Sequence, residues 1–428
     1  MTWTRRKFGC FAGAGCLAAL GKRVARGQAH ARVVVVGGGV GGATVARYLA
    51  ASAATLDVTL VEPKERYTTC FFSNFYLAGL RSLESLSHGY ERLAQQYGIK
   101  VIHDTVTTMD PVVKTVALQG GGKLNYDRAV VAPGIAFEFD AIEGYDEAAT
   151  QVLPHAWNAG PQTKLLRQQL ENMEDGGVFA IAAPPDPFRC PPGPYERACL
   201  VAYYFKQFKP RAKIIILDAK DTFFEQDLFQ DAWNRHYPGM IEWLPGQFTG
   251  GVKSVDVKAR VIKTAGETFK VSVANIIPPQ MAGELAQRVG LSDKSGWCPI
   301  DPITFESKLQ PGIHVVGDAI SSGEMPKSAF ATNSQAKTCA FAILASLTGV
   351  EQTTLHLFNT CFTILAPNDA VSDSINFKPV AGSIKIYDIF ISQVANQGIT
   401  NTRDSQNITR VIRVRLNFLA QMMNMSLD

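Results

Sequence analysis

Residues 31–50 read "ARVVVVGGGVGGATVARYLA", and this stretch decides the fold. Its valines predict a buried strand over 33–36, followed at once by Gly37-x-Gly39-x-x-Gly42 and an alanine-rich helix. Gly37 permits a tight turn, Gly39 lets the backbone approach a pyrophosphate, and Gly42 lets the helix pack closely on the strand. The order of strand, glycines and helix therefore predicts a Rossmann-like domain that binds a nucleotide at the helix N-terminus.

The next predicted strand, "DVTLVEP", ends in Glu62. A carboxylate at this place accepts hydrogen bonds from ribose hydroxyls and would repel a 2′-phosphate. The acid and the glycines together indicate a dinucleotide site.

Two later stretches indicate that the dinucleotide is FAD. Residues 304–320, "TFESKLQPGIHVVGDAI", place Gly317 and Asp318 after an apolar strand. They resemble the second FAD fingerprint of flavoproteins with two dinucleotide-binding domains, where the aspartate binds the ribityl chain. Residues 126–135, "YDRAVVAPGI", resemble the connecting motif of the same flavoproteins, which ends at Gly134, with Pro133 in place of a threonine. The three motifs occur in the expected order, so we expect bound FAD.

A second nucleotide-type domain begins with a strand at "GGVFAIAAP", a helix at 195–208 and a strand that ends in Asp218. The loop between the first strand and the helix, "PPDPFRCPPGPYE", holds a single glycine among prolines. Proline has no N–H group and stiffens the chain, so this loop does not form a nest of amides around a pyrophosphate. We expect that the electrons do not come from NAD(P)H; the alternative is a glycine-poor loop that still binds NADH.

The same loop carries Cys190 just before the helix, in a setting expected to be exposed. Thiols at a helix N-terminus have a lowered pKa and are good nucleophiles. By contrast, Cys199, Cys298 and Cys339 are expected to be small buried core residues.

The first 31 residues have the pattern of a twin-arginine export signal, with Arg5-Arg6, a weakly apolar stretch and Ala29-His30-Ala31. A basic first helix is the alternative. Six of the 42 Lys and Arg residues lie in this segment and no acid does, so the rest of the chain has 36 basic against 38 acidic residues. Net charge therefore gives no indication of nucleic-acid binding. We expect a periplasmic protein. The cysteines beyond the segment form no C-x-x-C pair, so zinc or iron–sulfur spacing is absent and no metal site is expected.

The chain resembles the flavoprotein subunit of flavocytochrome c sulfide dehydrogenases, relatives of sulfide:quinone oxidoreductases among the disulfide-reductase-like flavoproteins. The resemblance covers roughly residues 32–370, and "FRCPPGPYERA" is its most specific part. The other motifs are "VVVVGGGVGGATVARYL", "YTTCFFSN", "PHAWNAGPQT", "IHVVGDA", "MPKSAFATNSQAK" and "NTCFTILAP".

The resemblance assigns roles to three cysteines. Cys70 matches the residue that links covalently to the flavin, and Cys190 and Cys361 match a redox-active pair over the flavin. The resemblance implies that hydrosulfide attacks a Cys190–Cys361 disulfide and that electrons pass through FAD to haem c. It places this haem on a separate cytochrome subunit of a heterodimer, which agrees with the lack of a C-x-x-C-H motif in this chain. Lys327 and the helix that follows it are expected to close over the flavin, although a plain core helix explains the apolar face of that helix equally well. Glu196 could transfer protons, but a solvated carboxylate in the first turn of a helix is favoured.

The expected fold is α/β, with two Rossmann-like domains of the disulfide-reductase-like FAD fold and a C-terminal α+β interface domain. The expected boundaries are an export signal over 1–31, FAD-binding parts over 32–150 and 271–350, the second nucleotide-type domain over 151–270 and the interface domain over 351–428. In the last of these, an apolar helix face from Val411 to Met423 departs from the family pattern. We expect a terminal helix that packs on its own domain; docking on a partner subunit or on a membrane surface is the alternative.

The resemblance and the residues leave three functions open. The first is a sulfide dehydrogenase that reduces cytochrome c. The second is a membrane-peripheral sulfide:quinone oxidoreductase. The third is an exported flavoprotein without turnover that partners a haem protein. We find no apolar run long enough to span a bilayer.

Overall fold

A computed structural model describes residues 30–352, 356–367 and 369–394. The described residues from Ala31 onward form one compact unit. The predicted export signal, apart from its last two residues, and the predicted helix over 411–423 lie outside the described residues. In the described part of the chain, none of the helices has the length and apolar character needed to cross a membrane.

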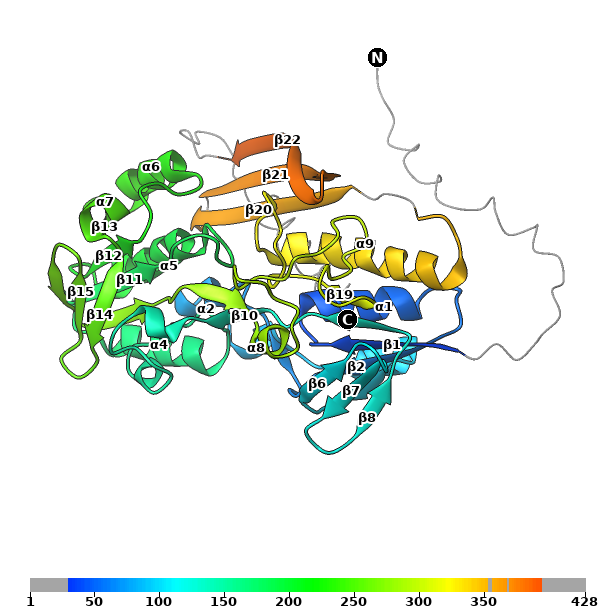
Figure 1. Cartoon of the computed structure of the whole chain (residues 1–428). Coiled ribbons are helices and arrows are strands. Elements are labelled where there is room, and N and C mark those ends of the chain that lie inside the picture. The colour runs from blue at the N-terminus through cyan, green and yellow to red at the C-terminus, as the bar shows by residue number, and fades with distance from the viewer. Residues whose placement is uncertain (1–29, 353–355, 368, 395–428) are drawn as a thin grey trace, which may run out of the picture. The chain divides into compact units, whose positions relative to one another are not determined.

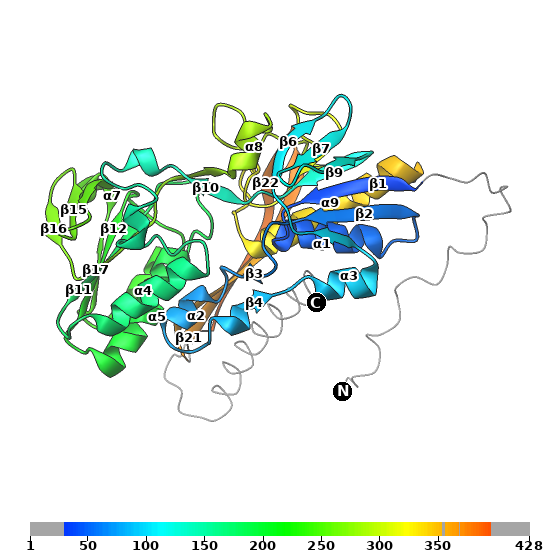
Figure 2. The ribbon, with the colours of Figure 1, turned by 90° about the horizontal axis from the view of Figure 1, so that it is seen from below.

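The opening stretch forms the centre of a parallel sheet with the order β19-β9-β1-β2-β5 (Figure 1). Its strands are β1 (Ala31–Val36), β2 (Leu56–Val61), β5 (Lys100–Ile102), β9 (Arg128–Val131) and β19 (Ile313–Val315). The four valines of β1 are at most 6% exposed because β1 pairs with a strand on each side and helices cover the sheet. Helices α1 (Val40–Ala50) and α9 (Ala329–Thr348) pack against each other beside this sheet (Figure 2). The continuous apolar run is thus explained by burial of both faces.

Smaller elements complete this first domain. An antiparallel meander is formed by β6 (Val106–Asp110), β7 (Thr115–Leu118) and β8 (Lys123–Asn125). Between β2 and β5 lie β3 (Tyr67–Thr68), α2 (Ser73–Leu77), the 3-10 turn η1 (Glu84–Leu86), β4 (Ser87–His88) and α3 (Glu91–Tyr97).

A second parallel sheet has the order β13-β12-β11-β17. Its strands are β11 (Val178–Ala183), β12 (Lys213–Asp218), β13 (Ile241–Leu244) and β17 (Val273–Ile276). Helices α4 (Pro161–Asn172), α5 (Gly193–Phe208), α6 (Gln226–His236) and α7 (Gly246–Thr249) belong to the same domain, together with the turns η2 (Phe139–Ala141) and η3 (Ala149–Gln151) and the meander β14 (Val252–Asp256), β15 (Val261–Thr264) and β16 (Thr268–Lys270). Because β17 pairs with β11 through buried residues, this sheet continues to Ile276, beyond the predicted boundary at 270.

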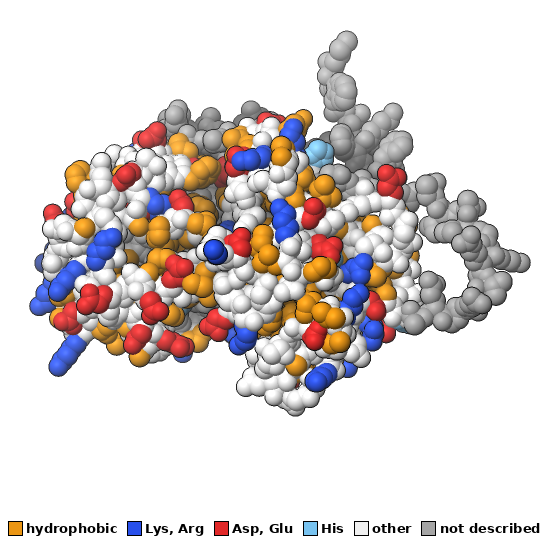
Figure 3. Space-filling model, in the orientation of Figure 1, with side chains coloured by type: hydrophobic (Ala, Val, Ile, Leu, Met, Phe, Trp, Pro, Cys, Tyr) orange, Lys and Arg blue, Asp and Glu red, His pale blue; other side chains and the backbone are white. Residues whose placement is uncertain are grey.

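The chain passes between the two domains through one antiparallel pair, β10 (Ile135–Phe137) and β18 (Gln280–Ala282), and α8 (Glu284–Arg288) follows. A third, antiparallel sheet is formed by β20 (Leu357–Ala366), β21 (Asp369–Val380) and β22 (Ser383–Val394). Strand β20 contacts both α9 and α5. The two parallel sheets confirm the predicted α/β class. On the face shown in Figure 3, acidic and basic side chains are interspersed, as their near-equal numbers predict.

Candidate active site

The glycine loop after β1 holds backbone in places where side chains do not fit. Gly37 has a φ of +96°, and a Cβ there would lie 2.4 Å from the carbonyl oxygen of Ala132. A Cβ on Gly42 would lie 1.9 Å from the carbonyl oxygen of Gly37, and Gly39 is the N-cap of α1. A glycine loop that leads into a helix N-terminus in this way is the arrangement that binds a pyrophosphate in dinucleotide-binding folds.

Glu62 follows β2 and lies against this loop. Its Oε2 accepts a hydrogen bond of 2.7 Å from the Gly38 amide, and its Oε1 accepts one of 3.1 Å from the Lys64 amide. The carboxylate is thus held at the carboxyl end of the sheet, where the ribose of a dinucleotide binds in this type of fold.

Asp318 lies after β19 at the same edge of the sheet. Its Oδ2 is 3.8 Å from Nη1 of Arg189, whereas its buried Oδ1 has no hydrogen-bond partner among the described residues. Gly317 has a φ of +86° and donates to Oε1 of Gln335 at 3.0 Å, and Gly134, with a φ of +66°, stands just before β10. A buried carboxylate oxygen without a donor fits a ligand that carries hydroxyl groups, as the ribityl chain of FAD does.

Cys70 lies in the same cluster as Asp318. Burial raises the pKa of the Cys70 thiol, and the Arg189 guanidinium counteracts part of this increase. Burial and the charge of Cys70 likewise raise the pKa of Tyr67. Burial acts to lower the pKa of Arg189, but the charges of Cys70, Asp318, Tyr67 and Cys190 raise it, and the net effect is an increase. Arg189 is therefore the positive charge that lies near all four of these groups. The structure brings Cys70, Asp318 and the proline-rich loop together.

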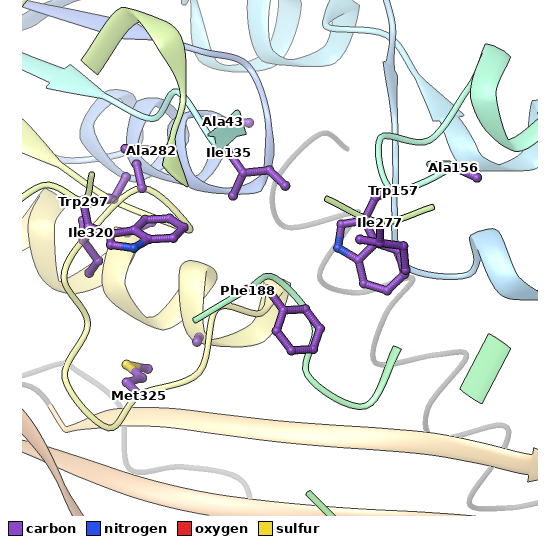
Figure 4. Packing of buried hydrophobic residues seen from close by; sticks show 14 of the residues in the cluster. Ala43, Ile135, Ala156, Trp157, Phe188, Ile277, Ala282, Trp297, Ile320 and Met325 are labelled. Carbon is purple, nitrogen blue, oxygen red and sulfur yellow. The ribbon is translucent and has the colours of Figure 1, made fainter. Parts of the chain in front are cut away.

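Lys327 is buried next to this cluster. Its Nζ donates to the carbonyl oxygens of Asp318 at 2.9 Å and Ile320 at 2.7 Å, and lies 3.6 Å from the centre of the Trp297 ring. Burial lowers the pKa of Lys327 to about 8. Figure 4 shows Trp297 and Ile320 on one side of this region and Trp157 on the other, with Phe188 of the proline-rich loop nearby.

Cys190 has a φ of +60° and stands three residues before the start of α5. Its amide donates to the Lys327 carbonyl at 2.7 Å, and its carbonyl accepts from the Gly193 amide at 2.8 Å. The residue is half-buried, not exposed as the sequence suggests, because the loop bonds to the segment that carries Lys327.

Cys361 lies in β20, and its Sγ accepts a hydrogen bond of 3.4 Å from Nδ2 of Asn359. The pKa of the Cys361 thiol is raised well above its ordinary value, first by burial and then by the charge of Asp373. The charge of Cys190 also raises it, so the two sulfurs lie within electrostatic range of each other. Hydrogen bonds link the segments that carry the two cysteines, because Ser328, next to the Lys327 that bonds to Cys190, donates to Oδ1 of Asn359 at 2.5 Å, and Asn359 bonds to Cys361.

Two acidic side chains surround Cys361. Asp373 stands directly opposite it in the β20–β21 register and is 1% exposed. Both carboxylate oxygens of Glu225 and Oδ1 of Asp373 are buried without a hydrogen bond of ordinary geometry among the described residues, although the Thr363 hydroxyl lies close enough to Glu225 to lower its pKa. Burial raises the pKa of Glu225 to about 8, with a further contribution from the charge of Asp373, and burial raises the pKa of Asp373 to about 6.

Asp218, the acidic residue at the end of β12 in the second nucleotide-type domain, is hydrogen-bonded to other side chains of the same domain. Asp218 is fully buried and accepts hydrogen bonds of 2.6 Å from Lys220, 2.5 Å from the Tyr195 hydroxyl and 3.0 Å from the Trp243 indole. The Tyr195 ring stacks on Phe223 at 3.6 Å between centroids. The carboxylate that would bind the ribose of a nicotinamide nucleotide is thus engaged within the protein.

The sequence reasoning missed several residues of the site. Arg189 stands beside Cys190 in the quoted loop, and its position in a proline-framed segment was the available signal. Asp373 and Glu225 gave no signal, because only the pairing of β20 with β21 and the start of α6 bring them to Cys361. Glu196 was expected to be solvated, and this was wrong: its carboxylate accepts from the Ile364 amide and from Nδ2 of Asn74, both at 3.0 Å. Cys199, Cys298 and Cys339 are fully buried, as expected.

These features define a flavoprotein of the two-dinucleotide-domain type. Residues 31–168 match the family model of the pyridine nucleotide-disulphide oxidoreductases, and residues 163–278 match that of the central part of the sulfide dehydrogenase [flavocytochrome c] flavoprotein chain. The structure resembles the sulfide:quinone oxidoreductase of Aquifex aeolicus with a TM-score of 0.70 and 18% identity, covering 93% of this chain and 92% of that one. It resembles putidaredoxin reductase with a TM-score of 0.64 and 17% identity, covering 90% and 94%.

Similar curated sequences indicate which family of flavoproteins this chain belongs to. The chain is 60% identical over 43 residues to the sulfide dehydrogenase [flavocytochrome c] flavoprotein chain of Chlorobaculum thiosulfatiphilum, covering 10% of this chain and 90% of that sequence. It is 24% identical over 296 residues to the mitochondrial sulfide:quinone oxidoreductase of Mus musculus, covering 68% of this chain and 65% of that one. It is 31% identical over 182 residues to the sulfide-quinone reductase of Aquifex aeolicus, covering 42% and 41%. The matched regions thus span less than two thirds of these last two relatives. The chain belongs to the family of sulfide-oxidising flavoproteins that includes the flavocytochrome c flavoprotein chains and the sulfide:quinone oxidoreductases.

Proposed function

We propose that this chain is the flavoprotein subunit of a sulfide dehydrogenase, which oxidises hydrogen sulfide at Cys190 and Cys361 and transfers the electrons through FAD to a c-type cytochrome. The observation that supports the proposal is the set of hydrogen bonds that joins the loop of Cys190, through Lys327, Ser328 and Asn359, to Cys361. Membership of an FAD-binding family indicates the cofactor, and the two cysteines are the groups with which a sulfur nucleophile would react.

The residues present fit FAD. The glycine loop after β1 would hold its pyrophosphate, Glu62 its adenosine ribose and Asp318 its ribityl chain. Bound FAD supplies a two-electron acceptor next to the cysteines. Lys327, with its pKa lowered to about 8, would place a positive charge or a proton donor near the flavin ring.

The proline-rich loop and the engaged Asp218 together argue against a nicotinamide donor. The loop offers few amides for phosphates, and Tyr195, Lys220 and Trp243 already use the carboxylate that would bind a ribose. A small sulfur nucleophile needs neither feature.

The chemistry at the cysteines is a thiol–disulfide exchange. Hydrosulfide attacks one sulfur of a Cys190–Cys361 disulfide, a bond forms between the substrate sulfur and that cysteine, and the other cysteine leaves as a thiolate. The persulfide and the thiolate then lose two electrons and one proton and join as a trisulfide, in which the substrate sulfur has gone from −2 to 0; bound FAD would be the acceptor of the electrons. A second hydrosulfide removes this sulfur as HSS⁻, and the Cys190–Cys361 disulfide forms again. The half-buried setting of both cysteines admits a small substrate and limits access by larger thiols.

We also propose that Cys70 links covalently to FAD and that the protein is periplasmic, exported by the twin-arginine route. Support for the link comes from the position of Cys70 beside Asp318 and Arg189, and support for export from the N-terminal pattern. Acid precipitation of the holoprotein tests the link: yellow colour in the pellet agrees with it, and colour released into the supernatant contradicts it.

The experiment that tests the function is anaerobic stopped-flow spectroscopy of the holoprotein mixed with sulfide. We expect rapid bleaching of the flavin in the wild type, no bleaching but normal FAD content in Cys361→Ser, and wild-type behaviour in the control Cys339→Ala, which changes a buried cysteine in α9. Bleaching at the wild-type rate in Cys361→Ser would contradict the role of the pair. If sulfide fails to bleach the wild-type flavin, the protein is a partner without turnover.

The sulfide:quinone oxidoreductase relatives support a second candidate, in which a quinone accepts the electrons. Steady-state assays with cytochrome c and with decylubiquinone separate the two functions. We expect reduction of cytochrome c; reduction of decylubiquinone alone, by a membrane-bound preparation, would replace the first candidate with the second.

A further inference from the structure

Arg197 is a buried cation whose role the flavin site and the cysteine chemistry do not yet explain. It lies in the second turn of α5, is 2% exposed and is among the largest fully buried side chains. Its guanidinium donates to Oδ1 of Asn74 at 3.0 Å, to Oδ1 of Asn275 at 2.6 Å and to the carbonyl oxygen of Ala156 at 2.9 Å. All three acceptors are neutral.

A guanidinium buried among neutral acceptors is costly unless a negative charge lies near. Within the residues that the structure describes, no ion pair joins Arg197 to a carboxylate. Burial lowers the pKa of Arg197 to about 9, and two groups counteract this decrease: first Cys190, then Glu196. Cys190 is therefore the group whose negative charge would do most to offset the burial of Arg197.

Cys190 and Arg197 both lie near the indole ring of Trp157. The guanidinium carbon of Arg197 lies 4.7 Å from the centre of the Trp157 ring. A Cβ built on Gly193 would lie 2.7 Å from Cη2 of Trp157 and 3.0 Å from Sγ of Cys190. The sulfur and the indole edge thus both approach the α-carbon of Gly193, and the guanidinium lies on the ring of the same indole.

The other charged groups near Cys190 do not replace Arg197. The charge of Cys190 also raises the pKa of Arg189, but the charges of Cys70 and Asp318 raise it more. His155, which Arg189 and Arg197 both affect, is neutral at pH 7, because burial above all lowers its pKa to about 3. Cys361 has the acidic side chains of Asp373 and Glu225 near it, and their charges raise the pKa of its thiol. The carboxylate of Glu196 accepts hydrogen bonds from Asn74 and from the Ile364 amide.

We propose that Arg197 is a positioning residue that stabilises a negatively charged sulfur at Cys190, both residues lying near the indole ring of Trp157. This deepens the proposed function and rests on it, because the charge matters when the Cys190 sulfur is released from the disulfide. The same argument explains why a fully buried arginine stands in the helix that begins at the reactive loop. The ligand of this cation is the protein's own thiolate.

The test measures the thiolate directly and needs no sulfide turnover. The holoprotein is reduced with dithiothreitol and desalted, and the rate of carbamidomethylation of Cys190 by iodoacetamide is followed from pH 5 to pH 10 by peptide mass spectrometry. Arg197→Gln removes the charge and Arg197→Lys keeps it. Arg167→Gln is the matched control, since Arg167 also packs on an aromatic ring, at 4.2 Å from Tyr204, but has a carboxylate partner in Glu171 at 2.7 Å.

We expect Arg197→Gln to alkylate Cys190 at least tenfold more slowly at pH 7, because an opposite charge nearby favours the ionised form by one or more pH units. Arg197→Lys is expected to keep most of the wild-type rate, and Arg167→Gln all of it. An unchanged rate in a folded, flavin-loaded Arg197→Gln protein would overturn the proposal.

If Arg197→Gln does not fold, the wild-type profile decides alone. Half-maximal alkylation of Cys190 clearly below pH 8.5, the ordinary region for a thiol, supports the proposal, and a midpoint at or above it overturns the proposal. Failure of the proposed function appears separately, as a flavin that sulfide does not bleach in the stopped-flow experiment.

Discussion

Glu225 gives this protein a pH-dependent stability that can be measured. Its carboxylate oxygens are buried without a hydrogen bond of ordinary geometry in the described structure, and burial raises its pKa from 4.5 to about 8 although the nearby Thr363 hydroxyl acts to lower it. The folded state therefore binds the proton more tightly than the unfolded chain does. The stability that this proton contributes is fully present below pH 4.5 and is lost as the pH rises towards 8.

The size of the effect follows from the two pKa values. A difference of one pKa unit corresponds to about 1.4 kcal/mol, so complete ionisation of Glu225 would lower the free energy of unfolding by roughly 5 kcal/mol at most. Asp373, whose pKa is raised to about 6, changes stability in the same direction at lower pH. Glu225→Gln keeps the shape of the side chain and removes its ionisation. We expect the variant to lose several kcal/mol less than the wild type between pH 5 and pH 8.5.

Urea unfolding followed by tryptophan fluorescence at pH 5, 7 and 8.5 measures this difference. Glu242→Gln, at an exposed carboxylate on β13, is the control and is expected to leave the pH dependence unchanged. The same pH dependence in the wild type and in Glu225→Gln would show that Glu225 ionises freely in the folded protein, and the reasoning from its burial would then be wrong.

Two further substitutions test the two nucleotide-type domains. Gly42→Ala puts a methyl group 1.9 Å from the Gly37 carbonyl oxygen, so we expect a protein without flavin, measured as the ratio of flavin to protein absorbance; a normal ratio would contradict this role of the glycine. Asp218→Asn removes the charge that pairs with Lys220 at 2.6 Å in a buried site, so we expect a loss of about 3 kcal/mol in urea unfolding and no gain of NADH oxidation. A loss below 0.5 kcal/mol would mean that the pair does not hold this domain together.

The parallel sheets and the flavin-binding edge could be predicted because their signals are local. The valines of β1, the glycines after it and Glu62 at the end of β2 lie within one short stretch of chain, and backbone sterics determine where they go. The second domain was recognisable in the same way, although β17 extends it past the expected boundary. A four-residue buried strand offers too short a pattern to separate it from the connecting segment.

The surroundings of the cysteines could not be predicted in the same way. The register of β20 with β21 places Asp373 opposite Cys361, and the start of α6 adds Glu225 to the same region. These contacts depend on how distant elements pack, and no spacing in the sequence records them. For the same reason the resemblance, and not the residue pattern, supplied the pairing of Cys190 with Cys361.

The bonds around Asp218 restrict how this fold can change its electron donor. Lys220, Tyr195 and Trp243 each use the carboxylate, so freeing it for a nicotinamide ribose requires several substitutions at once. Each single step leaves a buried charge or hydroxyl without its partner and lowers stability before any new binding is gained. A change to NADH as electron donor by single substitutions would therefore pass through destabilised variants. A laboratory selection would have to begin from a library that varies these positions together.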